Sequence, residues 1–220
     1  MTHIFFDLDG TLVDSFPGIE FSARVALASV CPKRAAPDFR PFIGPPIREV
    51  FRRALVEDDA QVLDALERAF RRSYDADGLL RTEAYPGVAE GLAELRDLGL
   101  VCHLLTNKPL RPTHEILRQL SLDGFFIEVI TPDSRTPRYA SKSEAAMEAC
   151  RRHGLAGPET LLVGDSPDDG VAAAACGFQF ATACFGYGNV HLESSITVHF
   201  RLECFSDLLS HVRNSTCITP

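Results

Sequence analysis

His3–Ser15 has the sequence HIFFDLDGTLVDS, a short apolar run that leads into two aspartates and then a glycine. The run His3–Phe6 predicts a central parallel strand, because such strands are buried on both faces. Asp7 and Asp9 follow at its carboxyl end, where the ligands of open α/β sheets bind. Residues two apart on a strand point the same way, so both carboxylates face one crevice if the strand continues through them. Their mutual repulsion predicts a cation or a shared proton. The alternative is a strand that ends in an ordinary polar turn.

Length and composition are those of an ordinary globular protein. The chain has 220 residues, which suffices for one large domain or for a core with a small insert. It is 45% hydrophobic and 24% charged, with a net charge of -8. The negative charge predicts no broad binding to nucleic acid polymers or to anionic membranes. Any phosphate site must then be local, built from a few cations and backbone amides.

Cysteine usage and the chain start predict a cytoplasmic protein. The seven cysteines are odd in number and widely spaced, without a CxxC pair. This pattern favours reduced thiols over a disulfide framework or a zinc site. The N-terminus enters an acid-bearing strand at once, so no signal peptide is expected, and no apolar run approaches the length of a membrane span.

A segment of different character separates the first strand from the rest of the chain. Helical spacing of apolar residues predicts helices over 19–30, 47–56 and 59–74, with Phe16-Pro17-Gly18 as a break before the first. Strand signals are absent here, and arginine and glutamate are dense. We therefore predict a small helical insert over residues 17–82, marginal on its own by size.

From Tyr85 onward, predicted strands alternate with predicted helices. The strands fall at 100–105, 125–130, 160–163 and 178–183, the helices at 87–98, 110–120, 142–153 and 168–176, and a short strand at 196–200 and a helix at 205–212 complete the chain. This alternation predicts an α/β fold, a Rossmann-like parallel sheet with helices on both faces. Its core comprises residues 1–16 and 83–220.

Three strands of this core end in polar residues that can meet at one edge of the sheet. These residues are Asp7 and Asp9, then Thr106-Asn107-Lys108, then Asp165-Ser166 with Asp168 and Asp169; Lys142 opens an intervening helix. Carboxylates suit Mg²⁺, a hard cation that prefers oxygen ligands. A hydroxyl, backbone amides and an ammonium group suit a phosphate. An aspartate can attack phosphorus as a nucleophile.

These motifs resemble those of the haloacid dehalogenase-like hydrolases. The stretch 7–15, DLDGTLVDS, is similar to the first motif, Leu105-Thr106-Asn107-Lys108 to the second, Lys142 to the lysine of the third, and 164–169, GDSPDD, to the fourth. Tyr85-Pro86-Gly87-Val88 is also typical of the family, and the resemblance spans the chain to about Gly188. The insert resembles the helical cap of the phosphoglycolate phosphatase-like branch.

The resemblance implies a role for each matching residue. Asp7 is the nucleophile, and Asp9 protonates the leaving oxygen and then activates the water that cleaves the aspartyl phosphate. Mg²⁺ is held by the Asp7 carboxylate, the Asp9 backbone carbonyl and Asp165. Thr106 and the Asn107 amide hold the phosphate, Lys142 neutralises Asp7 and the phosphate, and Asp169 supports the metal waters or Lys142.

Several assignments remain open at the level of sequence. Arg138 competes with Lys142 as the phosphate-site cation, and Ser141-Lys142 is also a plausible helix start with Glu144 three residues on. The stretch from Gly44 to Arg48 is interpreted as a loop that faces the substrate, or else as a simple proline turn.

Lys108 and Arg111 are interpreted as part of a solvated helix start, with attraction of anions at the mouth of the site as the alternative. Asp168 stands where many relatives have Asn, and it receives no catalytic role.

The resemblance implies a Mg²⁺-dependent phosphatase that hydrolyses a small phosphorylated metabolite, with phosphoglycolate, nucleotides and sugar phosphates all as possible substrates. Two alternatives are a phosphomutase of the β-phosphoglucomutase type and a non-catalytic phosphate-binding regulatory protein. The intact set of site residues argues against the non-catalytic alternative. Whether the protein is a monomer or a homodimer is left open by the sequence.

Overall fold

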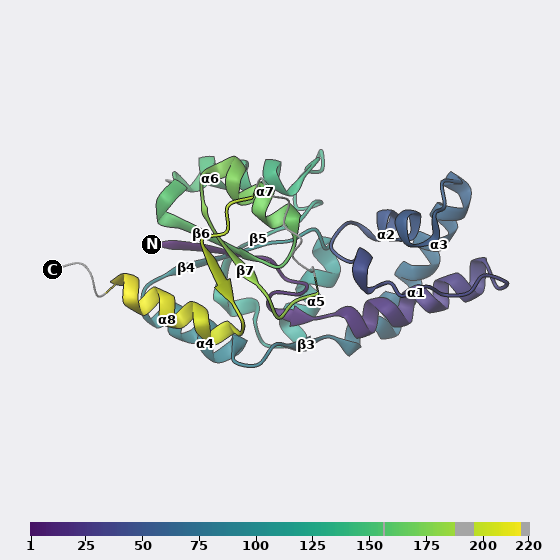
Figure 1. Cartoon of the computed structure of the whole chain (residues 1–220), viewed down its shortest axis with the longest axis horizontal. Coiled ribbons are helices and arrows are strands. Elements are labelled where there is room, and N and C mark those ends of the chain that lie inside the picture. Colours follow the sequence, from purple (N-terminus) through teal and green to yellow (C-terminus); the bar gives the residue numbers. More distant parts are fainter. Residues whose placement is uncertain (156, 188–195, 217–220) are drawn as a thin grey trace.

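Six parallel strands form the central sheet of the computed structural model, which describes residues 1–155, 157–187 and 196–216 (Figure 1). In sequence order the strands are β1 His3–Phe6, β4 Val101–Leu105, β5 Phe126–Ile130, β6 Thr160–Gly164, β7 Gln179–Ala183 and β8 Phe200–Leu202. Their order across the sheet is β5-β4-β1-β6-β7-β8. This topology places β1 at the centre and confirms the predicted α/β fold class.

Helices cover both faces of the sheet, as the alternation predicted. The helices α4 Val88–Asp97, α5 Leu110–Gln119 and α8 Phe205–Thr216 pack on the face of Ile4 and Phe6. The helices α6 Lys142–His153 and α7 Pro167–Cys176 pack on the opposite face, against Phe5. Successive residues of β1 therefore enter different cores, which is why this strand is apolar without interruption.

The insert after β1 is helical and lies beyond the carboxyl ends of the strands (Figure 1). It contains α1 Phe16–Val30, α2 Ile47–Leu55 and α3 Ala60–Ser73, with the short helical turns η1 Arg40–Phe42, η2 Tyr74–Gly78 and η3 Leu79–Arg81. The short turns η4 Asp123–Phe125 and η5 Gly157–Glu159 belong to the core.

Both connections to the insert run through one small antiparallel ribbon, β2 Val13–Asp14 with β3 Glu83–Ala84. Because this ribbon lies at both ends of the inserted segment, we propose residues 17–82 as a cap domain and residues 1–16 and 83–220 as the core.

Some predicted boundaries differ from the structure. Helix α1 begins at Phe16 and not after Gly18, because Pro17 lies in the first turn, where a helix does not need its N–H group. The last strand covers residues 200–202 rather than 196–200, and the last helix extends to Thr216.

Gly188 and Cys217 lie outside the described residues. The six cysteines within them are free thiols. No helix in the described part of the chain is long and apolar enough to cross a membrane.

Candidate active site

The end of β1 places Asp7 in the interior of the protein. The Asp7 amide donates to the Val163 carbonyl of β6 (2.9 Å), and the residue is only 6% exposed. The strand itself ends at Phe6, and the chain then turns, with the amides of Leu12 and Val13 both donating to the Leu8 carbonyl.

The condition that the strand continues through both aspartates is therefore not met, because Asp9 lies in this turn. Gly10, with φ of +81°, makes the turn possible. Asp7 and Asp9 nevertheless line the same cavity.

Lys142 joins two acidic groups from different strand ends. Its Nζ lies 2.6 Å from Asp7 Oδ1 and 2.5 Å from Asp169 Oδ1, and all three residues are buried. Asp169 Oδ2 also accepts from the Ser166 amide (3.0 Å) and hydroxyl (2.6 Å). This fixed carboxylate holds the ammonium group against Asp7.

Ser141-Lys142 is both the start of a helix and part of the site. Ser141 begins α6 and accepts from the Glu144 amide, and the first helical residue is Lys142. Arg138, the competing cation, is exposed at the cavity wall, whereas Lys142 contacts Asp7 directly.

Three buried carboxylates form a group with the composition of a metal site. One oxygen each of Asp7, Asp165 and Asp169 lie within 4.8 Å of one another. Oxygen donors of this kind fit Mg²⁺. A Cβ atom at Gly10 would lie 1.9 Å from Asp165 Oδ2, so only glycine allows the turn after β1 to approach Asp165. The resemblance implied the carboxylates of Asp7 and Asp165 with the Asp9 backbone carbonyl as metal ligands and Asp169 in a supporting role; the carboxylate group of the structure contains Asp7, Asp165 and Asp169.

Asp9 is held by residues that the sequence did not assign to the site. Lys108 Nζ lies 2.9 and 3.1 Å from the two Asp9 oxygens, and Ser15 Oγ donates to Asp9 Oδ1 (2.5 Å). Tyr187 OH lies 2.8 Å from Ser15 Oγ.

The interpretation of Lys108 as part of a solvated helix start is wrong, because the residue is buried against Asp9. Its position directly after Thr106-Asn107 was the available signal. Tyr187 lies 172 positions from Ser15 and carries no local signal.

Thr106 and Asn107 lie at the end of β4, beside β1, and line the same cavity. Thr106 is buried, and its Oγ1 accepts from the Lys108 amide (3.1 Å). The Asn107 side chain donates to Asp168 Oδ2 (3.2 Å), which joins the end of β4 to the first turn of α7.

Burial dominates the electrostatics of the site. It raises the pKa of Asp7 to about 7, although Lys142 opposes the shift. Burial disfavours the Lys142 ammonium, but Asp169 and Asp7 outweigh this effect and raise the Lys142 pKa. A divalent cation beside Asp7 would favour its ionised form.

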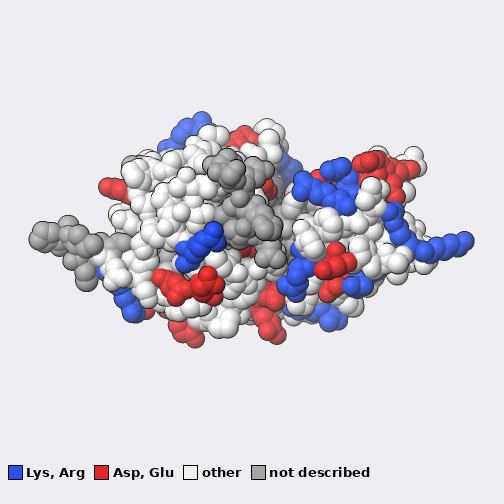
Figure 2. Space-filling view, in the orientation of Figure 1, with Lys and Arg blue, Asp and Glu red and all other residues white. Residues whose placement is uncertain are grey.

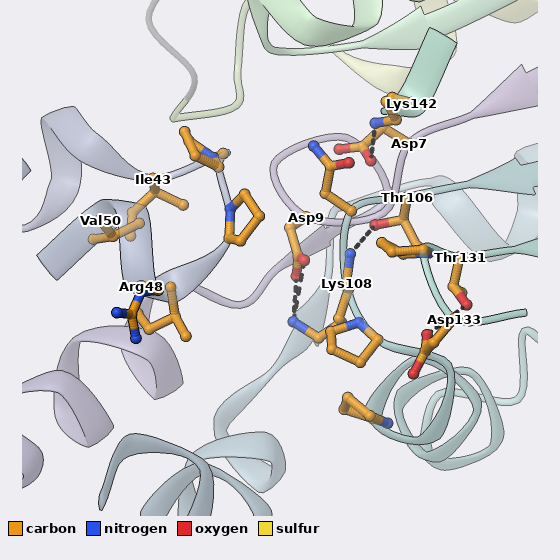
Figure 3. A pocket seen from close by; sticks show the side chains of 18 of the residues that line it. Asp7, Asp9, Ile43, Arg48, Val50, Thr106, Lys108, Thr131, Asp133 and Lys142 are labelled. Carbon is orange, nitrogen blue, oxygen red and sulfur yellow. Dashed lines mark hydrogen bonds and ion pairs between the residues drawn. The ribbon is translucent and has the colours of Figure 1, made fainter. Parts of the chain in front are cut away.

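A cavity of about 620 Å³ lies between the inserted helices and the core (Figure 3). Ile43, Arg48 and Val50 line it on the side of the insert, and Asp9 and Thr106 line it on the side of the core. This volume suits a small molecule.

Gly44 and Arg48, the two candidate specificity residues, both line this cavity, and Arg48 forms an ion pair with Asp64. On the outer surface in Figure 2, acidic and basic side chains lie next to each other rather than in one large basic patch.

Comparison with known proteins gives one family. The family model described as "Haloacid dehalogenase-like hydrolase" matches residues 4–183. The phosphoglycolate phosphatase of Nitrosococcus oceani is 31% identical, over 84% of this chain and 85% of its own length. The phosphoglycolate phosphatase of Vibrio parahaemolyticus is also 31% identical, over 95% of both chains. A haloacid dehalogenase-like hydrolase from Streptococcus pneumoniae has the same fold, with a TM-score of 0.85 at 24% identity over 96% of this chain and 98% of its own.

Proposed function

Because this chain belongs to the haloacid dehalogenase-like hydrolases, we propose that it is a Mg²⁺-dependent phosphatase that acts on a small, phosphoglycolate-like monoester. The observation that carries this proposal is the contact of Lys142 with Asp7 and Asp169, beside the buried Asp165. A nucleophilic carboxylate, a fixed cation and oxygen ligands for a metal are the groups that phosphoryl transfer requires.

In the proposed reaction, a carboxylate oxygen of Asp7 attacks phosphorus and the ester P–O bond breaks. Asp9 gives its proton to the leaving oxygen, so the alcohol departs neutral and an aspartyl phosphate remains on Asp7. Asp9 then takes a proton from a water molecule, which attacks phosphorus. The acyl phosphate bond breaks, inorganic phosphate leaves and Asp7 is regenerated. The contacts of Lys108 and Ser15 with Asp9 support this role, because they fix the position of its carboxylate.

We assign the phosphate to Thr106, the Asn107 amide and Lys142, and the metal to Asp7, Asp165 and the Asp9 backbone carbonyl. Bound Mg²⁺ would offset the negative charge of the phosphoryl group. Asp169 positions Lys142 through their direct contact. Since Lys142 already touches Asp7, we propose it, rather than Arg138, as the cation of the phosphate site.

The cations that line the cavity support a substrate that carries a second anionic group besides its phosphate. Arg48 is paired with Asp64, and Arg111 with Asp75 and Glu115. Arg138 lines the same cavity, is exposed, and forms no ion pair with another described residue of the chain. We propose that Arg138 receives a carboxylate such as that of phosphoglycolate, the substrate for which the relatives are named.

The test is phosphate release from a panel of small esters with Mg²⁺, by the wild type and by Asp7→Asn. We expect turnover that chelation abolishes and that Asp7→Asn lowers by at least about 10³-fold, since the nucleophile is lost. The matched control is Asp97→Asn, which removes the same charge from a side chain that is 77% exposed. Mg²⁺-dependent turnover retained by Asp7→Asn would rule out the assigned nucleophile.

Product analysis separates hydrolysis from transfer. We expect free phosphate in amounts equal to the ester consumed. An isomeric sugar phosphate formed without free phosphate would instead indicate a mutase. For substrate choice, Arg138→Met should raise the KM for phosphoglycolate about tenfold or more and leave the KM for an ester without a carboxylate nearly unchanged.

A further inference from the structure

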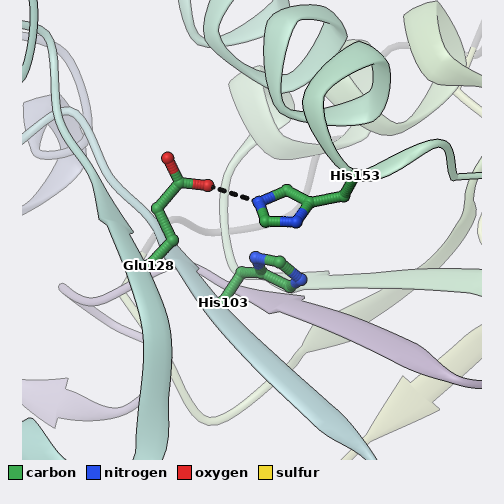
Figure 4. Close-up of side chains that lie close together, drawn as sticks. All are labelled: His103, Glu128 and His153. Carbon is green, nitrogen blue, oxygen red and sulfur yellow. Dashed lines mark hydrogen bonds and ion pairs between the residues drawn. The ribbon is translucent and has the colours of Figure 1, made fainter.

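A second group of metal-ligating side chains lies on the α6-covered face of the sheet (Figure 4). His103 of β4 is the register partner of Phe5 in β1 and of Glu128 in β5. Register partners in a parallel sheet project from the same face, so the three side chains form a row. His153, the last residue of α6, lies over this row. The fold therefore brings two imidazoles and a carboxylate together from three elements.

The ligand atoms are close to the spacing that a metal ion requires. One atom each of His103, Glu128 and His153 lie within 4.8 Å of one another, and His153 Nε2 is 2.9 Å from Glu128 Oε2. An ion about 2.0–2.1 Å from each ligand in tetrahedral geometry would hold them about 3.3 Å apart. The side chains of Glu128 and His153 are each 27% exposed, so small rotations can close the remaining gap.

His103 supplies an independent indication of a ligand. The residue is fully buried, and its Nδ1 has no hydrogen-bond partner among the described residues. Its Nε2 lies 3.0 Å from His3 Nδ1. When Nε2–H donates to His3, Nδ1 carries an unused lone pair, and Figure 4 shows the His103 ring beside the His153 ring, with the Glu128 carboxylate directed at His153. Buried polar atoms without partners are rare and call for an explanation.

The surroundings keep His103 in the neutral form. Burial, together with the nearby His153, His3 and Arg152, lowers the pKa of His103 to about 3, so its imidazole is neutral, as a metal ligand must be. Arg152 contacts Glu128 Oε1, which leaves Oε2 directed at His153. A hydrogen bond that orients a ligating carboxylate is typical of metal sites.

We propose that His103, Glu128 and His153 form a second metal site that binds a transition-metal ion such as Zn²⁺. Two imidazole nitrogens and one carboxylate oxygen suit such an ion better than Mg²⁺, which prefers oxygen ligands alone. The bound ion joins β4, β5 and the end of α6, and so stabilises the half of the core that carries Thr106 and Lys142. This proposal is independent of the phosphatase assignment, because it uses none of those residues.

The test measures Zn²⁺ binding to the full chain with the carboxylate site saturated by Mg²⁺. We expect one Zn²⁺ per wild-type chain, a melting temperature that rises with Zn²⁺, and an absorption spectrum of bound Co²⁺ that reports nitrogen ligands. His153→Gln and Glu128→Gln should each weaken Zn²⁺ binding by about tenfold or more and remove the thermal shift. These two side chains are partly exposed, so the variants are expected to fold; circular dichroism checks this.

The matched control is His114→Gln, which removes a histidine of α5 outside the group. Its Zn²⁺ affinity and thermal shift should equal those of the wild type. Equal Zn²⁺ affinity in wild type, His153→Gln and Glu128→Gln would overturn the proposal. So would Zn²⁺ binding that disappears entirely in Asp165→Asn, because the ion would then occupy the carboxylate site alone.

Discussion

At the scale of single residues, Asp7 combines two properties that rarely occur together. It is buried, which favours its neutral form, and it contacts Lys142, which favours its ionised form. Burial has the larger effect and raises its pKa to about 7. The side chain is therefore poised to exchange a proton for a metal ion near neutral pH.

This balance predicts that Mg²⁺ affinity depends on pH. Below about pH 7, the metal must displace a proton from Asp7, so the apparent dissociation constant should rise by up to about tenfold per pH unit as the pH falls. Above pH 7 it should level off. Calorimetric Mg²⁺ titrations between pH 5.5 and 8.5 measure this, and Asp7→Asn should abolish the dependence on this proton. A dissociation constant that stays flat across this range would contradict the assignment.

Lys108 is the second residue whose environment defines its role. It is buried, contacts both oxygens of Asp9 and lies over the Tyr74 ring. Lys108→Met should lower kcat by about 10²-fold, because Asp9 loses a contact that fixes its carboxylate. Steady-state kinetics measure this. Lys33→Met, the same change at an exposed position outside the cavity wall, serves as control. A kcat within twofold of wild type would show that Asp9 needs no such partner.

At the scale of elements, the turn after β1 connects the strand, the carboxylate group of Asp7, Asp165 and Asp169, and the insert. It places Asp7 at the strand end, Asp9 against Lys108, and Gly10 against Asp165. The ribbon of β2 and β3 follows directly. One short stretch of chain thus fixes the proposed nucleophile, the proposed acid and the connection to the inserted helices.

Gly10→Ala should damage this turn in two ways. The positive φ of +81° costs an alanine about 1–2 kcal/mol, and the new Cβ would lie 1.9 Å from Asp165 Oδ2. We expect lower unfolding free energy and weaker Mg²⁺ binding, measured by denaturant unfolding and calorimetry.

Gly99→Ala is the matched control for Gly10→Ala. Gly99 has a similar φ of +77°, but nothing lies within 4 Å of its Cβ position. It should lose stability without losing Mg²⁺ affinity. Unchanged Mg²⁺ affinity in Gly10→Ala would show that Asp165 tolerates the displacement.

At the scale of the whole molecule, the cavity exists only because the insert lies over the carboxyl ends of the strands. The exposed pair Arg111–Asp75 joins α5 to the turn η2 of the insert across this boundary. Such a surface pair contributes at most about 1 kcal/mol. The contacts across this boundary also include the Lys108 ammonium over the Tyr74 ring, and apolar residues of the insert and the core belong to one hydrophobic cluster.

Cavity size predicts a preference for small esters. A space of about 620 Å³ holds a small metabolite but not a folded phosphoprotein or a nucleic acid end. We expect kcat/KM for a phosphorylated peptide to be at least about 10²-fold below that for phosphoglycolate, measured as phosphate release under the same conditions. p-Nitrophenyl phosphate, a small ester without a carboxylate, controls for intrinsic reactivity. Equal rates on peptide and small ester would mean that the insert does not restrict access.

The alternation of apolar and polar segments was sufficient to predict the α/β sheet, and the boundaries of α6 were predicted to the residue. The spacing of residues did not predict the backbone at Asp9. There the chain forms a turn, closed by hydrogen bonds to the Leu8 carbonyl, instead of continuing as a strand. The spacing also did not predict that Lys108 is buried, because its burial depends on the contact with Asp9, 99 positions away. Periodicity reports local backbone geometry, whereas burial of a charge depends on what the fold brings against it.

By itself, the sequence determined the parallel sheet, the position of the inserted helices and the strand ends that carry Asp7, Thr106 and Asp165. These follow from hydrophobic spacing and turn chemistry, which act between near neighbours in the chain. Only the tertiary structure decided that Lys142 and not Arg138 contacts Asp7, that Lys108 holds Asp9, and that His103, Glu128 and His153 lie together. The physical reason is that strand register and helix packing, which no local pattern encodes, set the distances between these charges.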